Sequence, residues 1–148
     1  MQPTTFDDLL GTLKSKQGEA DINSVKEAEI VCLYFTSNWS PPCKRFTPIL
    51  IDFYKEINLD PGHPKLEIVF VSSDKTEEEY TRYYEEMPWL AMQFADVTKS
   101  NQLRTRYNVE QIPTLIVLNR ECELVTKTGR ADVMKDGENA FVNWGGSP

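Results

Sequence analysis

Three short stretches of the chain are apolar at nearly every position. We predict strands there, over residues 29–36, 66–72 and 114–118. A run that is apolar on both faces is typical of a buried central strand whose sheet is covered by helices on each side. Cys32 falls inside the first run, and we expect it to be a small buried hydrophobe with an inert thiol.

A helical pattern follows the first strand. Ser40 is a good N-cap and Pro41 a good first helical residue, because the N–H that proline lacks has no partner in the first turn. Apolar positions then recur with the helical period, at Phe46, Ile49, Leu50, Phe53 and Tyr54. Pro48 falls inside this helix and should kink it. Further helices are predicted at residues 4–13, 77–87, 99–107 and 131–144, the last weakened by Gly137.

Two weaker strands complete the pattern. Residues 20–25 could form a short edge strand, and residues 123–127 are expected to pair back on the third strand after a turn at 119–121. A helix between two parallel strands implies a right-handed crossover. This element order predicts an α/β fold, with a central mixed β-sheet flanked by helices on both faces. No repeat or linker divides the chain, so we expect residues 1–148 to form a single domain.

Charge and hydropathy exclude several function classes. The 148 residues carry a formal net charge of −7 and show no basic stripe, so we expect no direct nucleic-acid binding. No apolar run approaches the roughly 20 residues of a membrane helix. The N-terminus also lacks the basic and apolar regions of a secretory signal. We therefore expect no membrane association and a location in the cytosol, with the nucleus as an alternative.

The cysteine and histidine counts are low. Three cysteines do not suggest a disulfide-stapled secreted domain, and a single histidine leaves no His-rich metal site. That histidine, His63, lies between Gly62 and Pro64, so we expect it in a surface loop. We expect no metal and no other cofactor.

The boundary between the first strand and its helix is the candidate site. A thiol at the N-cap position of Ser40 would face unpaired backbone N–H groups and the positive end of the helix dipole, which favour a thiolate. Cys43 lies one helical turn deeper, where a second, resolving thiol belongs. Ile112 and Pro113 open the third strand. A cis proline there would present the preceding backbone to an extended peptide beside the turn.

These residues carry a family resemblance. The stretch Trp39-Ser40-Pro41-Pro42-Cys43-Lys44-Arg45-Phe46-Thr47-Pro48 resembles the motif of the tryparedoxin and nucleoredoxin branch of the thioredoxin superfamily. That motif is Trp-Cys-Pro-Pro-Cys, then Arg or Lys, then Phe-Thr-Pro. Residues 87–91, 107–109 and 112–115 match as well, in order and at suitable spacing, so the resemblance covers nearly the whole chain and implies a thioredoxin-like fold.

The resemblance also implies roles for single residues. Ser40 would occupy the position of the nucleophilic cysteine and Cys43 that of the resolving cysteine. Trp39 would flank the reactive position, and Pro113 would be the cis proline. The remaining residues expected to shape the site are Pro41, Pro42, Lys44 and Ile112. Many thioredoxins carry a buried aspartate six residues before the nucleophile; here, as in tryparedoxins, that residue is a tyrosine, Tyr34, so we assign no carboxylate base.

A serine at position 40 changes the expected activity. Thiol–disulfide exchange needs a thiolate that attacks a disulfide sulfur, and a hydroxyl has neither the acidity nor the sulfur chemistry. We predict that this chain is inactive or nearly so as a disulfide reductase. Either the serine is an engineered replacement in an active oxidoreductase, or the chain is a natural, divergent member that binds partners without catalysis. The sequence is compatible with both.

Two function classes therefore compete. The first is a protein-disulfide reductase, for which the resemblance implies peroxiredoxin-like proteins, redox-sensitive signalling proteins or transcription factors as partners. The second is a redox-inactive module that holds a protein or peptide between Trp39 and Pro113. A metal or iron–sulfur site through Cys43 ranks far below both, because one cysteine supplies too few ligands. We expect the chain to be a monomer.

Two further residues stand apart from the motif. Cys122 falls at an expected hairpin tip, where it could be exposed, and either an intermolecular disulfide or a free thiol without a role would suit that place. Trp89 could line the rim of the site or belong to the core.

Overall fold

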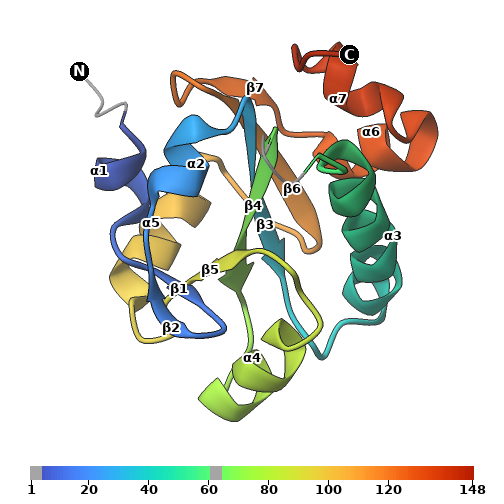
Figure 1. The fold of residues 1–148 in the computed structure, drawn as a ribbon. Helices are drawn as coiled ribbons and strands as arrows, with labels where there is room; N and C mark the ends of the chain where they lie inside the picture. Colours follow the sequence, from blue (N-terminus) through green and yellow to red (C-terminus); the bar gives the residue numbers. More distant parts are fainter. Residues whose placement is uncertain (1–4, 61–64) are drawn as a thin grey trace.

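The structure is a computed structural model that describes residues 5–60 and 65–148. Seven strands in these ranges form one mixed sheet, in the order β2-β1-β5-β4-β3-β6-β7 (Figure 1). Their bounds are β1 Leu13–Ser15, β2 Gly18–Ala20, β3 Ile30–Thr36, β4 Leu66–Ser72, β5 Leu90–Met92, β6 Thr114–Asn119 and β7 Leu124–Thr126. The three predicted apolar strands are β3, β4 and β6. They lie side by side at the centre of the sheet, with β3 parallel to β4 and antiparallel to β6.

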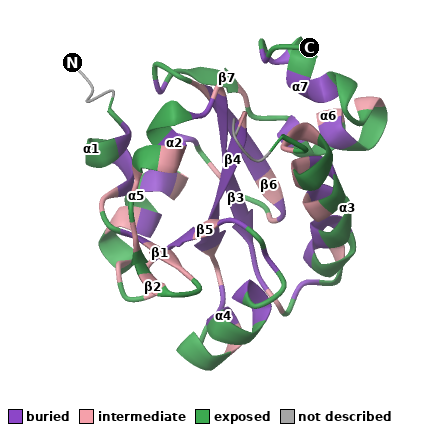
Figure 2. Ribbon diagram, viewed as in Figure 1, coloured by how far each residue is buried: buried purple, intermediate pink, exposed green. Residues whose placement is uncertain are grey.

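Helices cover both sides of this sheet (Figures 1 and 2). Their bounds are α1 Phe6–Leu10, α2 Asn23–Glu27, α3 Pro41–Ile57, α4 Glu77–Tyr84, α5 Val97–Arg106, α6 Gly129–Asp136 and α7 Asn139–Asn143. On one side, residues of α3, α4, α6 and α7 pack with Tyr34 and Phe70 of the sheet; we call this the aromatic face. On the other, residues of α1, α2 and α5 pack with Leu33 and Val69; we call this the aliphatic face. The expected mixed sheet with helices on both sides is confirmed.

The N-terminal third departs from the prediction. The helix expected at residues 4–13 ends at Leu10, because Gly11 adopts φ +67° and the chain then turns into β1. The edge strand expected at residues 20–25 is wrong. The strand, β2, ends at Ala20 in a hairpin with β1. Residues 23–27 form α2 instead, next to Asp21, whose carboxylate accepts the N–H of Asn23.

Two other helices are shorter than predicted. The helix expected at residues 77–87 ends at Tyr84 as α4, and the chain soon enters β5, which the sequence pattern did not predict. The helix expected at residues 131–144 is split into α6 and α7 at Gly137, where φ is +57°. By contrast, α3 runs from Pro41 to Ile57 with Pro48 inside it, and the kink at Pro48 stays a prediction.

The C-terminal residues are fastened to the start of β3. The backbone N–H of Ser147 donates to Glu29 Oε1 at 2.8 Å, and the Ser147 hydroxyl donates to Glu29 Oε2 at 3.0 Å. Gly146 packs so closely on the Phe141 ring that a side chain there would collide with it. In the described part of the chain, no helix has the length and apolar character needed to cross a membrane.

Candidate active site

The predicted turn joins the carboxyl end of β3 to the first turn of α3. Ser40 has an extended backbone and is the N-cap of α3, as expected, and its carbonyl accepts the N–H of Lys44 at 3.0 Å. The Ser40 hydroxyl makes no capping hydrogen bond, and the residue is 5% exposed. Trp39, immediately before it, is 54% exposed. A mostly buried position at a helix N-terminus thus lies beside an exposed indole.

The residues after Ser40 form the first turn of α3. Cys43 is fully buried, whereas Pro41 and Lys44 are exposed and Pro42 is intermediate. The Lys44 ammonium donates to the side-chain oxygen of Asn38 at 3.1 Å and so links the helix back to the turn. Because Cys43 has no exposed surface, a partner molecule can reach it only after local rearrangement.

The second predicted segment, Ile112–Pro113, lies next to the turn. The peptide bond between the two residues is cis, as expected. Thr114, the first residue of β6, pairs with Phe35 near the carboxyl end of β3, which brings the cis bond to the edge of the sheet where the turn begins. Pro113 is buried and Ile112 is intermediate. The structure thus brings together the two distant segments that the sequence singled out.

A third segment, residues 72–74 after β4, was missed by the sequence reasoning. The Asp74 carboxylate accepts the backbone N–H of Asn38 at 2.7 Å through Oδ1 and the Ser72 hydroxyl at 2.7 Å through Oδ2. The Trp39 indole N–H donates to the Ser73 carbonyl at 3.4 Å. Burial raises the pKa of Asp74, and these hydrogen bonds oppose the rise. The strand pattern could have indicated this segment, because β3 and β4 are parallel and the residues that follow their carboxyl ends meet at one edge of the sheet.

Behind Cys43, on the aromatic face, four hydroxyls form a buried network. Thr47 is at its centre: its oxygen lies 2.7 Å from the hydroxyl of Tyr34, 2.7 Å from that of Tyr83 and 2.9 Å from the carbonyl oxygen of Cys43. The Thr36 hydroxyl lies 2.8 Å from that of Tyr83. Burial raises the pKa of Tyr34 and of Tyr83, so both phenols stay neutral and can donate.

The donor and acceptor count fixes the direction of these bonds. A carbonyl only accepts, so Thr47 donates its single proton to Cys43. Tyr34 and Tyr83 must then both donate to Thr47, and Thr36 must donate to Tyr83. All four protons therefore point along the network toward the first turn of α3. Tyr34 stands where no carboxylate base was assigned, and it supplies a neutral donor instead.

Comparison with known proteins decides the family. A protein-family profile described as thioredoxin-like matches residues 28–124, which include the turn, Cys43 and the cis proline. The chain belongs to the thioredoxin-like family.

Named relatives place this thioredoxin-like chain more closely. Nucleoredoxin from Homo sapiens is 35% identical over 147 residues, which cover 99% of this chain and 33% of that protein. The chain thus spans about a third of the length of the nucleoredoxins it matches. Tryparedoxin from Trypanosoma brucei brucei is 36% identical over 133 residues, which cover 89% of this chain and 90% of that protein.

Solved structures agree with the relatives. Tryparedoxin I from Crithidia fasciculata superimposes with a TM-score of 0.78 at 34% identity, covering 89% of this chain and 92% of that one. A tryparedoxin II complexed with glutathionylspermidine gives a TM-score of 0.76 at 34% identity, covering 87% of this chain and 88% of that one. The relatives and the solved structures thus agree on the family and on the fold of this chain.

Other expectations for this thioredoxin-like chain are settled by burial. Cys122, which could have been exposed at the hairpin, is 4% exposed and lies in the same apolar cluster as Tyr107. Burial raises the pKa of this thiol and of the Cys32 thiol, and neither favours a thiolate. Trp89 is a core residue, 2% exposed and in edge-to-face contact with Tyr34. His63 lies outside the described residues.

Surface cavities do not coincide with the turn. A cavity of about 1060 Å³ lies between α5 and the β6–β7 hairpin and includes none of the predicted site residues. A smaller cavity, of about 480 Å³, is lined by Ser73, Asp74 and Arg104 and so adjoins the turn. In the described ranges, no group of three or more His, Cys, Asp or Glu side chains could hold a metal ion.

Proposed function

We propose that this chain is a protein-disulfide reductase scaffold in which Ser40 stands in the place of the attacking cysteine. The observation that carries the proposal is the placement of residue 40. It is the N-cap of α3, beside the exposed Trp39, at the sheet edge where the cis Ile112–Pro113 bond also lies. Cys43 follows one helical turn deeper. With Ser40 the scaffold binds partners but does not complete a dithiol cycle.

The exchange reaction explains why one atom decides the activity. A thiolate at position 40 would attack one sulfur of a partner disulfide, form a mixed disulfide and release the other partner sulfur as a thiolate. The Cys43 thiolate would then attack the sulfur at position 40 and release the second partner thiol. The partner disulfide gains two electrons, and a disulfide joins positions 40 and 43. Serine stops the cycle at its first step, because its hydroxyl cannot form the mixed disulfide.

The helix and the hydroxyl network would each assist this chemistry. Pro41 and Pro42 have no backbone N–H, so the N–H of Cys43 and the dipole of α3 are the groups that favour a thiolate at position 40. The Tyr83 phenol is close enough to Cys43 for a charge on that sulfur to raise the pKa of Tyr83. We infer that the network of Tyr34, Thr47 and Tyr83, through the Thr47 hydrogen bond to the Cys43 carbonyl, holds the first turn of α3 and so positions the Cys43 sulfur.

The partner class follows from the shape of the site and from the relatives. An exposed indole beside a cis proline suits an extended segment of a protein around its disulfide. We propose peroxiredoxin-like proteins, redox-sensitive signalling proteins or transcription factors as partners, met by a monomer in the cytosol or the nucleus. The finer choice among them rests on the kinship with tryparedoxin and nucleoredoxin.

The test restores the missing sulfur. The Ser40→Cys variant should reduce insulin disulfides with dithiothreitol as the electron source. The rate should exceed that of the Ser40 chain on the order of 10³-fold or more, the scale of loss when a catalytic nucleophile is removed. The double variant Ser40→Cys, Cys43→Ser is the matched control: it should form the mixed disulfide with insulin and turn over only as fast as dithiothreitol releases it. Equal activity of the Ser40 chain and the Ser40→Cys variant would overturn the proposal.

A second candidate is a partner-binding module without electron transfer. It is favoured by a serine at position 40 beside Trp39, which is 54% exposed and would form the docking surface. Here the Ser40 chain and the Ser40→Cys variant would capture the same partners with equal affinity, and neither would reduce disulfides. Binding measured by titration, together with the insulin assay, separates the two candidates.

A further inference from the structure

A half-buried arginine on α5 contacts the turn after β4. The Arg104 guanidinium donates through Nη2 to the Ser72 carbonyl at 2.5 Å and to the Ser73 hydroxyl at 3.1 Å. Its Nη1 donates to the side-chain oxygen of Asn101 at 3.1 Å, which fixes the side chain along its own helix. All three acceptors are neutral, and burial lowers the pKa of Arg104. A cation that is partly desolvated in this way, without a carboxylate partner among these contacts, needs these hydrogen bonds to offset its burial.

The same turn holds the residues that precede Ser40. The Ser73 N–H donates to the Thr36 carbonyl at 3.0 Å, and the Ser73 carbonyl accepts the Trp39 indole. One residue later, Asp74 accepts the N–H of Asn38 at 2.7 Å. Arg104 therefore contacts residues 72 and 73, and residues 73 and 74 contact residues 36, 38 and 39. The hydrogen bonds form a continuous path from α5 to the exposed indole.

The cavity beside Arg104 does not favour an anion as ligand. Arg104 and Lys75 line it, but so does the Asp74 carboxylate, and Glu79 is close enough to raise the pKa of Asp74 further. The charges largely cancel, and the guanidinium already donates to three oxygens of the chain. The contacts are those of a structural brace: one arm of the planar arginine fork, Nη2, joins a carbonyl and a hydroxyl of one turn, and the other, Nη1, is held by Asn101.

We propose that Arg104 is a positioning residue that holds Trp39 in place through the turn at residues 72–74. It touches neither residue 40 nor Cys43 in any of its hydrogen bonds and acts only through the turn. Its effect on disulfide exchange rests on the function proposed above, whereas its effect on Trp39 does not. Loss of the brace frees the indole and weakens partner docking, which raises KM more than it lowers kcat.

The first experiment measures Trp39 directly in the Ser40 chain. Trp89 and Trp144 are 2% and 7% exposed, so acrylamide quenching reports mainly on Trp39, and a parallel Trp39→Phe variant removes its share. In Arg104→Met the quenching constant of Trp39 should rise by up to about 2-fold, the limit for an indole already 54% exposed. The fluorescence anisotropy of Trp39 should fall. Arg104→Lys keeps the charge but loses the fork, so its quenching constant and anisotropy should lie between those of the native chain and those of Arg104→Met.

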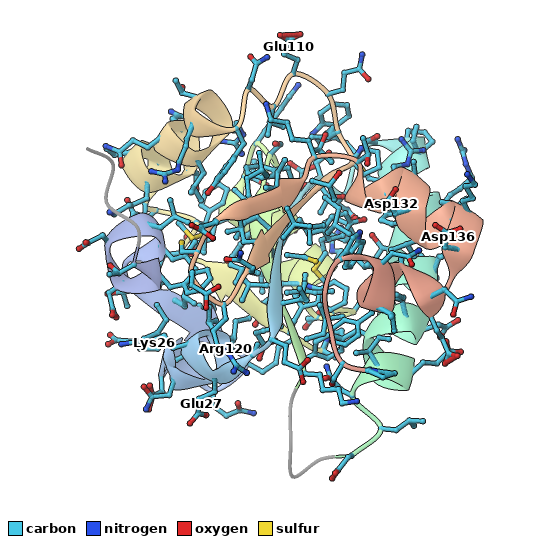
Figure 3. All side chains as sticks on the ribbon, turned by 90° about the horizontal axis from the view of Figure 1, so that it is seen from above. Lys26, Glu27, Glu110, Arg120, Asp132 and Asp136 are labelled. Carbon is cyan, nitrogen blue, oxygen red and sulfur yellow. The ribbon has the colours of Figure 1, made fainter. Side chains whose placement is uncertain are left out.

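Arg120 offers a matched control at the other end of the sheet. It also donates to backbone carbonyls, from Nη2 to Glu27 at 3.2 Å and from Nε to Ala28 at 3.4 Å, and lies near Glu27 (Figure 3). Arg120→Met should leave the quenching and the anisotropy of Trp39 unchanged. Unchanged quenching in folded Arg104→Met, or an equal rise in Arg120→Met, overturns the proposal. If Arg104→Met does not fold, Ser73→Ala and Arg104→Lys decide in the same way, because each removes part of the fork's contacts.

The second experiment repeats the comparison in the Ser40→Cys background. There Arg104→Met should lower kcat/KM for insulin about 10-fold, chiefly through KM. If Ser40→Cys itself is inactive, the proposed reductase function fails, and the fluorescence result alone decides the brace. If Ser40→Cys is active and Arg104→Met changes neither KM nor kcat, the claim that Arg104 affects disulfide exchange is overturned.

Discussion

The two faces of the central sheet are equally well buried but differ in chemistry. On the aliphatic face, β3 presents Val31, Leu33 and Phe35, which are fully buried among apolar side chains. On the aromatic face, the alternate residues Tyr34 and Thr36 take part in hydrogen bonds with α3 and α4. One strand thus carries an apolar anchor on one side and a polar network on the other. Only the polar network is hydrogen-bonded to Cys43, through Thr47.

This difference between the two faces means that residues that mainly stabilise the fold lie on one face, and residues that could also affect the chemistry lie on the other. An apolar face contributes stability in proportion to the surface it buries and has no group that moves a proton. A buried polar network contributes less net stability, and it must be fully satisfied to be tolerated. Substitutions on the aliphatic face should therefore change stability alone, and those on the aromatic face should also change the exchange reaction.

The largest expected effect lies on the aliphatic face. Leu33→Ala removes a fully buried side chain from the centre of β3 and should lower the free energy of unfolding by about 2–5 kcal/mol. Urea denaturation measures the loss. In the Ser40→Cys background, and at a temperature where the variant is folded, insulin reduction should keep its rate. A fall in kcat comparable to that caused by changes on the aromatic face would break the distinction between the two faces.

A smaller effect is expected at the centre of the hydroxyl network. Thr47→Val keeps the shape but removes the oxygen that Tyr34 and Tyr83 share, which leaves the Tyr34 proton without its acceptor. The free energy of unfolding should fall by about 1–3 kcal/mol. In the Ser40→Cys background the turnover should fall as well. Thr47→Ser retains the hydroxyl and is the control: if it slows turnover as much as Thr47→Val does, the network has no part in the exchange.

The smallest expected effect concerns Glu67, which is 5% exposed and accepts the Tyr54 hydroxyl at 3.0 Å. Burial raises its pKa above the ordinary value of 4.5, so folding favours the protonated form. That contribution to stability is complete below the unfolded pKa and is lost as the pH rises through the folded pKa.

Glu67→Gln keeps an oxygen acceptor and has no charge to bury. At neutral pH it should unfold with a free energy equal to or up to about 1 kcal/mol above that of the native chain. The advantage should vanish as the pH falls toward 4.5. Urea unfolding across this pH range measures it, with the exposed Glu56→Gln as the control. A Glu67→Gln variant that is less stable at neutral pH than at pH 4.5, relative to the native chain, would show that the carboxylate is stabilising.

The parts of the fold that could be predicted are those whose burial produces a recognisable pattern of apolar residues in the sequence. β3, β4 and β6 are buried on both faces, so nearly every position in them is apolar. β1, β2 and β5 are three residues long, too short for any periodicity, and they exist because neighbouring strands pair with them. The break at Gly137 was only half predicted, since glycine weakens a helix in many places where it does not end it.

The same distinction applies to the site. Residues 39–44 are contiguous, and Pro113 starts a strong strand, so a motif could identify them. Asp74 and Arg104 act through contacts between segments that are far apart in the chain. The parallel pairing of β3 with β4 could have placed Asp74 near the turn, but no local pattern marks the contact of Arg104. Cys122 illustrates a related limit. A position at a hairpin suggests exposure, but the residue is buried in the same apolar cluster as Tyr107.

The fastening of Ser147 to Glu29 has a practical consequence. Glu29 immediately precedes β3, and the turn that carries Trp39 and Ser40 begins where β3 ends, so the seven residues of the strand separate the two by about 20 Å. A tether attached after Pro148 would therefore leave the molecule at the end opposite Trp39. Immobilisation on a solid support through the C-terminus should present the docking surface to solution, whereas attachment through Lys44 should obstruct it.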